Sequence, residues 1–511
     1  MNMKKINLKK GLVNCWSLIF ILFAQGTFAQ EVYTLEQCRK LALEQNKKVK
    51  IAQEKAQAST ALRKSAFTKY LPDFKINAGY LHTNKALELL QHDMFLPIIP
   101  YNAIDQQTGK FNPGIFQDDP ETALKTLVIN PETGKPLTDA SGNPVFQQYA
   151  LLPADQMKLD YKNAYYAGLS VMQPLFTGFK ITEAYRIAQY TETIENNNVI
   201  LTKAELVDKT DEAYWRVVSM NEKVKLAQSY LELLNRLVFD LENLYDEGLI
   251  IRNDLLKAQV KQNDAKLKLL KAENGLTLSK MVLAQIMGVE SDNLAVADGV
   301  ESGLEKESLP YLASSKMVDN RVEIAMLKQK VSIAESAQKI ATSRFMPDIF
   351  LSGGYTYLNP NPYKGFEKKF GGDWNIGVVL SMPIFHWGDR VHTLNAAKKD
   401  RQAVQYELDE ARELIDLQIR QSINAYTESL DKVAISKLSK EQAKESMDIS
   451  QNHFNEGLIK LTDLLESQLD WEQASNNYID AVIEMKIART ELDKATGAIY
   501  DYPEMYNQEN N

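Results

Sequence analysis

The segment YDEGLIIRND, residues 245–254, occurs a second time as FNEGLIKLTD, residues 454–463. Other matching residues keep the same offset of 209 positions over more than a hundred residues. They include Gly168, Pro174, Phe176, Gln259 and Gly288, which match Gly377, Pro383, Phe385, Gln468 and Gly497. A fixed offset that carries Gly, Pro and Asp together indicates that one structural unit is duplicated within the chain.

A second set of matches shows where the two copies differ in length. Leu71-Pro72-Asp73 matches Met346-Pro347-Asp348 at an offset of 275, so 66 additional residues lie between the two blocks in the first copy. We therefore expect a first structural repeat at 30–288, an inter-repeat equatorial linker at 289–320, a second repeat at 321–498 and a C-terminal tail at 499–511.

The N-terminus has the pattern of a secretory signal. Basic residues are followed by an apolar run from Leu12 to Phe23, and a small residue suited to cleavage stands at Ala29, so we expect a signal peptide at 1–29. Its removal leaves Cys38 as a single cysteine and therefore no intramolecular disulfide. The remaining chain has a formal net charge of −12, which argues against nucleic acid as a partner.

Four later segments alternate apolar residues with small or polar ones and predict strands, at about 73–82, 163–173, 348–358 and 374–382. The loop at 83–160 is long and dense in Pro, Gly, Asn and Asp, with room for small hairpins. No stretch after the signal reaches the roughly 18 apolar residues of a membrane helix. If the protein enters a membrane, we expect it to do so with strands.

Helices are predicted on both sides of the strands. Residues 35–70 have a helical composition that ends at Pro72. Between Gly178 and Gly248 there is no Pro or Gly, and a continuous helix of that length would be about 100 Å long. Its second half carries an apolar coiled-coil seam, formed by Val217, Met220, Val224, Ala227, Leu231, Leu234, Val238, Leu241 and Tyr245. Residues 390–456 take the same role in the second copy, with a less regular seam.

Gly248 and Gly457 break these helices, and new ones are expected at Asn253-Asp254 and Thr462-Asp463. Asn and Thr suit the helix cap, and Asp suits the first turn.

Four membrane-exposed strands cannot close on themselves, because an open strand edge is not tolerated in lipid. Three chains would supply twelve strands and a wall of helices with near six-fold symmetry. The expected fold is therefore mostly α with a membrane β-barrel. The chain contains a duplicated unit made of a strand pair and a long-helix hairpin. In a trimer these units form a 12-stranded barrel that is continuous with an α-helical periplasmic tube.

The sequence blocks that occur in both copies resemble those of the TolC-like outer membrane efflux proteins. The resemblance is carried by the two Pro-Asp blocks, by Pro174-Leu175-Phe176 with Pro383-Ile384-Phe385, and by residues 245–259 with 454–468. It implies a homotrimeric exit duct in the bacterial outer membrane that extends into the periplasm. Such ducts pair with a periplasmic adaptor and with an inner-membrane pump, such as an RND or ABC transporter, which supplies the energy.

Asp254 and Asp463 are the main candidate site residues. In a trimer they would supply six carboxylates near the mouth of the tube, where the resemblance places a gate, and such a ring favours cations. The alternative is that each Asp only stabilises a helix start, by about 0.3–1 kcal/mol. Lys257 and Glu466, one turn later, make any polar network there asymmetric.

The tips, Gly248-Leu249 and Gly457-Leu458, are the second candidates. Glycine permits the sharp reversal, and an exposed Leu followed by Ile offers an apolar surface. The resemblance implies that these tips meet the adaptor. The alternative is that the Leu side chains are tucked under the bend.

Aromatic residues near the strand ends are typical of an interfacial belt in contact with outer membrane lipid, although core packing would also explain them. They are Tyr80, Tyr161, Tyr165, Tyr166, Tyr355, Tyr357, Trp374 and Trp387. Phe176 and Phe385 are expected to shape the passage from strand to helix.

No catalytic, cofactor-binding or metal-binding residue is predicted. Among the five His residues only His386 and His392 are near each other, and no phosphate-binding loop or nucleophile motif occurs. A passive conduit for efflux or secretion is therefore favoured over an enzyme. The alternative of another class is a trimeric coiled-coil surface structure or adhesin, with residues 83–160 as its binding head.

Overall fold

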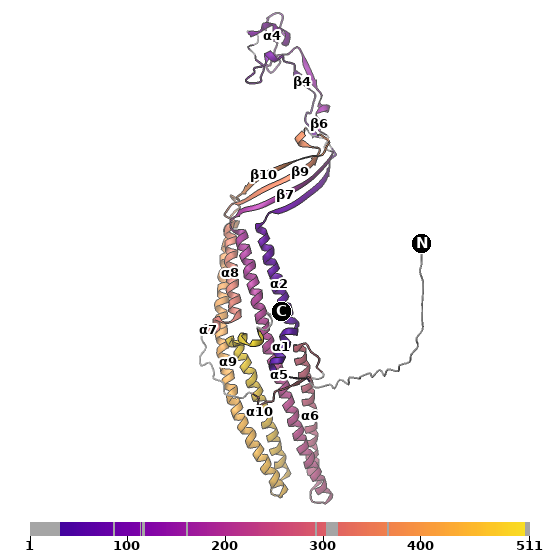
Figure 1. The fold of residues 1–511 in the computed structure, drawn as a ribbon, viewed down its shortest axis with the longest axis vertical. Coiled ribbons are helices and arrows are strands. Elements are labelled where there is room, and N and C mark those ends of the chain that lie inside the picture. Colours follow the sequence, from indigo (N-terminus) through magenta and orange to yellow (C-terminus); the bar gives the residue numbers. More distant parts are fainter. Residues whose placement is uncertain are drawn as a thin grey trace, which may run out of the picture. The chain divides into compact units, whose positions relative to one another are not determined.

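The computed structural model describes residues 31–84, 87–112, 114, 118–159, 162–291, 294–302, 315–364 and 367–505. The expected signal peptide lies outside these residues, as do Tyr161 and parts of the expected linker and tail. The chain divides into two compact units (Figure 1). The helical unit comprises Met1–Ala66, Glu183–Lys339 and Val391–Asn511, and the strand unit comprises Phe67–Thr182 and Ile340–Arg390.

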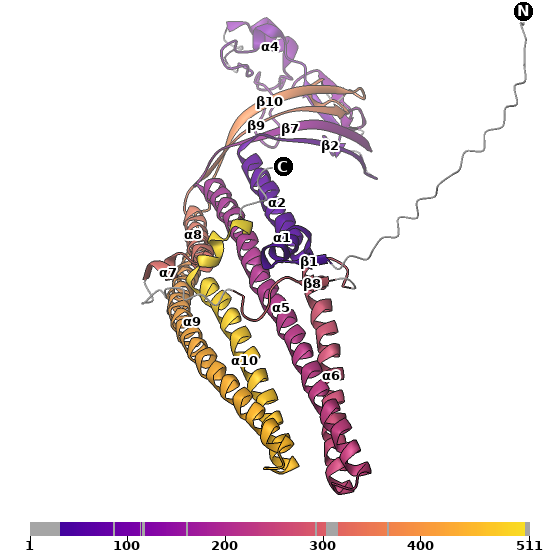
Figure 2. The same cartoon turned by 60° about the horizontal axis from the view of Figure 1, so that its bottom comes forward.

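Two long helical hairpins dominate the helical unit (Figure 2). Helix α5 (Lys180–Asp246) is followed by α6 (Arg252–Met287), and α9 (Asp389–Asn455) is followed by α10 (Leu461–Thr496). Helices α5 and α9 have 67 residues each, which corresponds to about 100 Å, and α6 and α10 have 36 each. The expected duplicated hairpins are therefore present. The repeat boundaries at 30–288 and 321–498 stay predictions.

The first helical segment differs from the expectation, because it is broken into α1 (Leu35–Gln45) and α2 (Lys47–Phe67). Asn46 between them has extended backbone angles, φ −66° and ψ 132°. Its side chain accepts a hydrogen bond from the Lys48 N–H at 2.9 Å and donates to the Ile286 carbonyl at 2.9 Å. A tertiary contact therefore outweighs the helical composition of this segment. In the second copy α7 (Ser315–Asp319) and α8 (Val322–Ser343) precede the strands.

The coiled-coil seam of α5 is largely buried, as predicted. Val217, Leu234 and Leu241 are each at most 1% exposed, whereas Tyr245 at the end of the seam is 38% exposed. The lower part of the seam forms one cluster, the hairpin core, with residues of α6 and α10. Its members include Tyr230, Leu234, Leu237, Val238, Leu241, Leu255, Ala258, Ala265, Leu461, Leu464 and Leu465. The first and second copies thus share a hydrophobic core.

The upper part of the helical unit contains a second core and a small sheet. Strand β1 (Glu31–Tyr33) pairs in parallel with β8 (Leu294–Val296). Buried residues around them include Cys38, Tyr214, Val218, Leu283, Met287, Tyr478, Val482 and Leu492. In the described part of the chain, no helix is both long enough and apolar enough to cross a bilayer.

The strand unit is built on a four-stranded antiparallel sheet of order β10-β9-β7-β2. Its strands are β2 (Asp73–His82), β7 (Asn163–Thr177), β9 (Asp348–Asn359) and β10 (Gly371–Ser381). Strand β7 runs past the expected end, and its register shifts between Pro174 and Phe176 where it pairs with the start of β9. The two copies meet at β7 and β9, which leaves β2 and β10 as the edges.

The long loop of the first copy contains secondary structure of its own. Strand β3 (Leu87–Glu88) pairs with β6 (Lys158–Leu159), and β4 (Met94–Pro97) pairs with β5 (Tyr149–Leu152). A short helix, α4 (Pro120–Thr126), lies at the far end of this segment (Figure 1). The loop between β9 and β10, in contrast, holds only a short 3-10 turn at Pro362–Lys364 among its described residues.

Candidate functional site

One face of the four-stranded sheet is apolar and exposed. The observed register aligns alternate residues of all four strands on this apolar face. They are Phe74, Ile76, Tyr80, Leu169, Val171, Leu351, Tyr355, Trp374, Ile376, Val378 and Leu380. Ile76 is 81% exposed and Trp374 is 70% exposed. A continuous exposed surface of this kind indicates contact with lipid or with another apolar surface.

The opposite face carries small and polar residues, among them Lys75, Asn77, Ser170, Ser352 and Asn375, together with a few larger side chains such as Tyr166, Met172 and Val379. Glycine is required at one point on this face, because a Cβ on Gly354 would lie 2.8 Å from the Leu169 carbonyl oxygen. This face is therefore more polar than the apolar face, as the wall of an aqueous passage is more polar than its outer surface.

Aromatic rings gather at both ends of the sheet. At one end the ring centroids of Tyr80 and Tyr165 are 4.9 Å apart, and Tyr357 stacks on Phe370 at 5.3 Å. At the other end the rings of Phe385 and Trp387 are 5.1 Å apart. This arrangement agrees with an interfacial belt, to which Phe370 adds a residue that the sequence analysis missed.

The passages from strand to helix contain two consecutive residues with left-handed backbone angles. In the first copy they are Gly178 and Phe179, with φ of 57° and 68°, and in the second Trp387 and Gly388, with φ of 45° and 82°. The pairs occupy matching positions in the two repeats, but the aromatic residue and the glycine are exchanged. A Cβ on Gly178 would lie 2.9 Å from the Ser343 carbonyl oxygen, so this position is also sterically restricted.

The tips of the two hairpins have the same backbone geometry. Gly248 and Gly457 both have φ of 76°, and each is followed by a Leu that is 66% exposed. The next residues, Ile250 and Ile459, pack against the hairpin core. The alternative in which Leu249 and Leu458 are tucked under the bend is therefore wrong, and the Ile residues pack there instead. Each tip presents one exposed Leu side chain.

The expected helix caps are wrong. Helix α6 has Ile251 as its N-cap, and α10 has Lys460. In the described structure, neither N-cap side chain forms a capping hydrogen bond with a backbone N–H of its helix. Asn253 and Thr462 are inside the first turn. Asp254 and Asp463 also lie in that first turn, where a carboxylate interacts favourably with the helix dipole.

Asp254 and Asp463 have different surroundings. Lys257 Nζ lies 3.1 Å from Asp254 Oδ1 and neutralises that carboxylate. Asp463 Oδ1 instead accepts a hydrogen bond from the Thr462 hydroxyl at 3.1 Å, and Glu466 one turn later adds a second negative charge. With Arg252 and Lys261 beside this pair, the start of α6 is basic. The start of α10 is acidic, because Asp463 and Glu466 outnumber Lys460.

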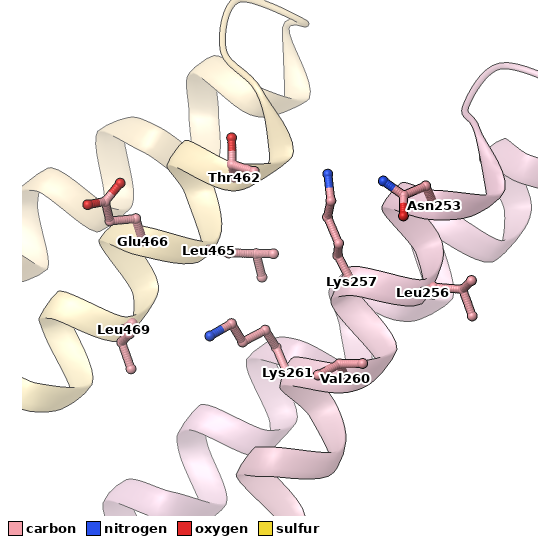
Figure 3. A pocket seen from close by; sticks show the side chains of 9 residues that line it. All are labelled: Asn253, Leu256, Lys257, Val260, Lys261, Thr462, Leu465, Glu466 and Leu469. Atoms are coloured by element: carbon pink, nitrogen blue, oxygen red, sulfur yellow. The ribbon is translucent and has the colours of Figure 1, made fainter.

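A pocket of about 490 Å³ lies between the starts of α6 and α10 (Figure 3). Lys257 and Lys261 of α6 and Leu465 of α10 project into the space between the helices. The other lining residues are Asn253, Leu256, Val260, Thr462, Glu466 and Leu469. The pocket joins the first turns of the two hairpins, but neither Asp254 nor Asp463 is among its lining residues. Sequence reasoning did not single out Lys261, which no motif marks.

A model of the outer membrane efflux protein family matches residues 142–289 and 313–498. The chain belongs to the outer membrane efflux protein family. This outer membrane efflux protein is 23% identical over 305 residues to the outer membrane protein TolC of Vibrio cholerae, covering 58% of this chain and 69% of that protein. It is 21% identical over 351 residues to the alkaline protease secretion protein AprF of Pseudomonas aeruginosa, covering 66% and 71%.

The efflux protein has the same fold as CusC, a protein whose crystal structures concern the conformational changes that accompany folding and transmembrane channel formation. The TM-score is 0.69 at 12% identity, covering 90% of this chain and 91% of that chain. The fold class expected from the sequence is confirmed: it is that of trimeric channels with a barrel and a helical tube. The protein is located in the outer membrane and extends into the periplasm.

The family and the fold are those of channel proteins. Among the described residues, no group of three or more His, Cys, Asp and Glu side chains is arranged to hold a metal ion. The role of the efflux protein as an outer membrane duct for efflux or secretion follows from its family and its relatives.

Proposed function

We propose that three copies of the chain pair edge to edge, with β2 of one copy beside β10 of the next. The open edges of the four-stranded sheet support this pairing, because unpaired backbone groups are not tolerated in lipid. Three such sheets give twelve strands, with the apolar face toward outer membrane lipid and the polar face toward the passage.

The helical units of the three copies continue the passage as a periplasmic tube in this proposal. Each copy contributes two hairpins, so the wall has near six-fold symmetry. The duct itself is passive, and its energy comes from an inner-membrane pump of the RND or ABC type through a periplasmic adaptor. Membership of the efflux family, and similarity to a protein named for protease secretion, support a place in such a three-part system.

The gate lies at the starts of α6 and α10 in this proposal, with Asp254 and Asp463 at the constriction. Lys257 pairs with Asp254, and Arg252 and Lys261 add further positive charges to that half of the ring. Asp463 and Glu466 outnumber Lys460 and make the other half acidic. The ring therefore alternates basic and acidic positions, and it attracts cations less strongly than six unpaired carboxylates would.

The adaptor contact lies at the tips, where Gly248, Leu249, Gly457 and Leu458 form the two turns. Leu249 and Leu458 are exposed apolar side chains at matching positions of the two turns, and Ile251 adds another at the first tip. An exposed apolar side chain next to a tight turn is suited to a partner's apolar surface. Replacing both with Asp is expected to abolish efflux in cells while the purified trimer still forms. Loss of the trimer would instead assign these residues to folding.

The experiment that tests the duct is conductance in a planar bilayer, measured for the native chain and for the double variant Asp254→Ala, Asp463→Ala. A small native conductance that rises several-fold in the variant supports the gate. An unchanged conductance would leave the duct in place and reduce the two residues to stabilisers of helix starts. No conductance from either protein, with trimers present in the membrane, would contradict the duct.

A further inference from the structure

Residues beyond β2 and β7 continue the same hairpin outward. The Thr83 N–H donates to the Lys162 carbonyl at 2.9 Å, directly after the last pair of β2 and β7. Pairing resumes at β3 with β6 and at β4 with β5, and the Ile98 N–H donates to the Gln148 carbonyl at 2.9 Å. The register shifts by a single residue over this distance. We call residues 87–98 and 148–159 the outer ribbon; β6 and β4 follow one another along it in Figure 1.

The outer ribbon is two strands wide and consists of two short sheets, β3 with β6 and β4 with β5, with a 3-10 turn at Ala154–Met157 between β5 and β6. Strand β9 ends at Asn359, opposite Tyr165, and in the described part of the chain no further strand pairs with the ribbon beyond that point. A two-stranded hairpin alone is marginally stable in water. Something else must therefore cover it.

Both faces of the outer ribbon carry exposed apolar side chains. Phe95 and Leu151 are directly opposite each other and are 64% and 52% exposed. Met94 and Leu96 lie on the other face and are also exposed. Three of the four charged groups of the ribbon, in contrast, make contacts within it; the fourth is Asp155.

Two contacts account for these charges. Glu88 pairs with Lys158 at 3.2 Å, and the Asp93 carboxylate accepts the Ala154 N–H at 2.8 Å. An apolar partner of the outer ribbon would therefore leave these two contacts in place.

We propose that the outer ribbon packs against the outer ribbons of the other two copies and forms a cap over the outer end of the duct. This inference rests on the trimer of the proposed function. The ribbon leaves the sheet from β2 and β7, and β2 is the edge that meets the next copy. A self-complementary apolar surface repeated around a symmetry axis is the usual basis of a closed oligomer contact.

Lipid is a poorer occupant, because the sheet already spans the membrane without the ribbon. Strand β2 has 10 residues and β10 has 11, and a membrane strand needs about 9–11. The ribbon starts beyond this length. The neighbouring copy's β10 begins at Gly371 and so provides no strand to pair with the ribbon's outer edge. The equivalent ribbons are then the apolar surfaces that remain available.

Cysteine crosslinking in isolated outer membranes tests the cap. Phe95→Cys is treated with a bismaleimide, and Lys135→Cys, in an exposed turn of the same insertion, is the matched control. Cys38 is kept because it is buried. The protein without an added cysteine is treated in the same way, so that any crosslinking through Cys38 is measured. We expect crosslinked dimers and trimers of the Phe95→Cys protein at several times the level of the Lys135→Cys control. Leu151→Cys should behave like Phe95→Cys.

Each other outcome overturns the cap. If no crosslinks form, full reaction of Phe95→Cys with a water-soluble maleimide would show that the ribbon is uncovered. If a fluorescent label attached at Phe95→Cys is quenched by brominated lipid, the ribbon contacts lipid instead. The native mass of the solubilised protein is measured in parallel. A monomer would contradict the proposed trimer as well, whereas a trimer without crosslinks at Phe95→Cys and Leu151→Cys would contradict the cap alone.

Discussion

Lys268 Nζ of α6 lies 2.8 Å from Glu472 Oε2 of α10, and this pair joins the first repeat to the second. Glu472 is only 7% exposed and also accepts a hydrogen bond from the Asn476 side chain at 2.7 Å. Lys268 extends over the Tyr230 ring, 5.5 Å from its centroid. The two hairpins of one chain are therefore held together by a specific polar contact in addition to the hairpin core.

Lys268→Met should destabilise the helical unit, because Glu472 then keeps its charge in a buried position with only Asn476 as a partner. We expect a loss of about 1–3 kcal/mol. This is below the cost of breaking a fully buried pair, because Lys268 is 42% exposed and screened by water. The loss of stability is measured from the denaturation midpoint of the solubilised protein. Adding Glu472→Gln should recover part of the loss, and a double variant worse than the single one would contradict the pairing.

Lys257→Met should increase the preference of the duct for cations. The substitution removes the positive charge that lies 3.1 Å from Asp254 and makes the proposed ring less basic on the α6 side. The reversal potential under a salt gradient reports the change, and Asp463→Asn should shift it in the opposite direction. Lys209→Met, an exposed position on α5, is the control. Equal shifts for both lysine variants would rule out a local effect at the mouth.

Gly248→Ala and Gly457→Ala should each cost about 1–2 kcal/mol, because both glycines have left-handed angles that an L side chain disfavours. Among the described residues no atom lies within 4 Å of a Cβ built at either position, so the cost comes from the backbone alone. Gly299→Ala is the matched control, since that glycine has equal space without a left-handed angle. Thermal unfolding of the three variants compares them, and a similar loss for Gly299→Ala would refute the argument.

The contact between Arg321 and Glu323 should stabilise the helical unit only above acidic pH. Burial raises the pKa of Glu323, but hydrogen bonds and charge from Arg321 outweigh it and hold the pKa below its ordinary value. A carboxyl group whose pKa is lower in the folded protein than in the unfolded chain stabilises the fold at pH values above its pKa in the unfolded chain. This stabilisation is lost as the pH falls through its pKa in the folded protein. Unfolding measured from neutral to acidic pH should show that decline. It should be smaller in Glu323→Gln, and identical profiles would contradict the assignment.

The sheet and the two long hairpins could be predicted because their signals are periodic and occur twice. Alternation of apolar residues gave the strands, and the spacing of Val217, Leu234 and Leu241 gave the buried seam of α5. The break at Asn46 could not be predicted, since its cause is a contact with the carbonyl of Ile286, far away in the sequence. Local composition contains no information about such a partner.

The candidate site was predicted in position but not in its electrostatics. Asp254 and Asp463 are in the first turns of their helices, as expected, but Lys257 folds back onto Asp254. The spacing of three residues permits that contact without requiring it. The N-caps were wrong because each helix resumes three residues after Leu249 or Leu458, before the polar residues that usually cap.

A buried polar contact of the helical unit also escaped the sequence analysis. Asp211 is fully buried on α5 and receives two hydrogen bonds from Arg39, at 2.7 and 2.6 Å, and one from the Thr490 hydroxyl at 2.8 Å. No periodic signal marked it, because the alternating steps of the apolar seam reach Ala213 and Thr210 and pass over Asp211. A fully buried carboxylate needs a partner of opposite charge, which Arg39 supplies here.

The exchanged residues at Gly178-Phe179 and Trp387-Gly388 show what duplication has preserved in this protein. Both copies keep two consecutive left-handed residues where a strand turns into a long helix, yet glycine is first in one copy and second in the other. The bend therefore needs two left-handed residues in succession but not glycine at one fixed position. Either order of glycine and an aromatic residue turns a membrane-side strand into a long helix, so the two copies can keep the same path with different sequences.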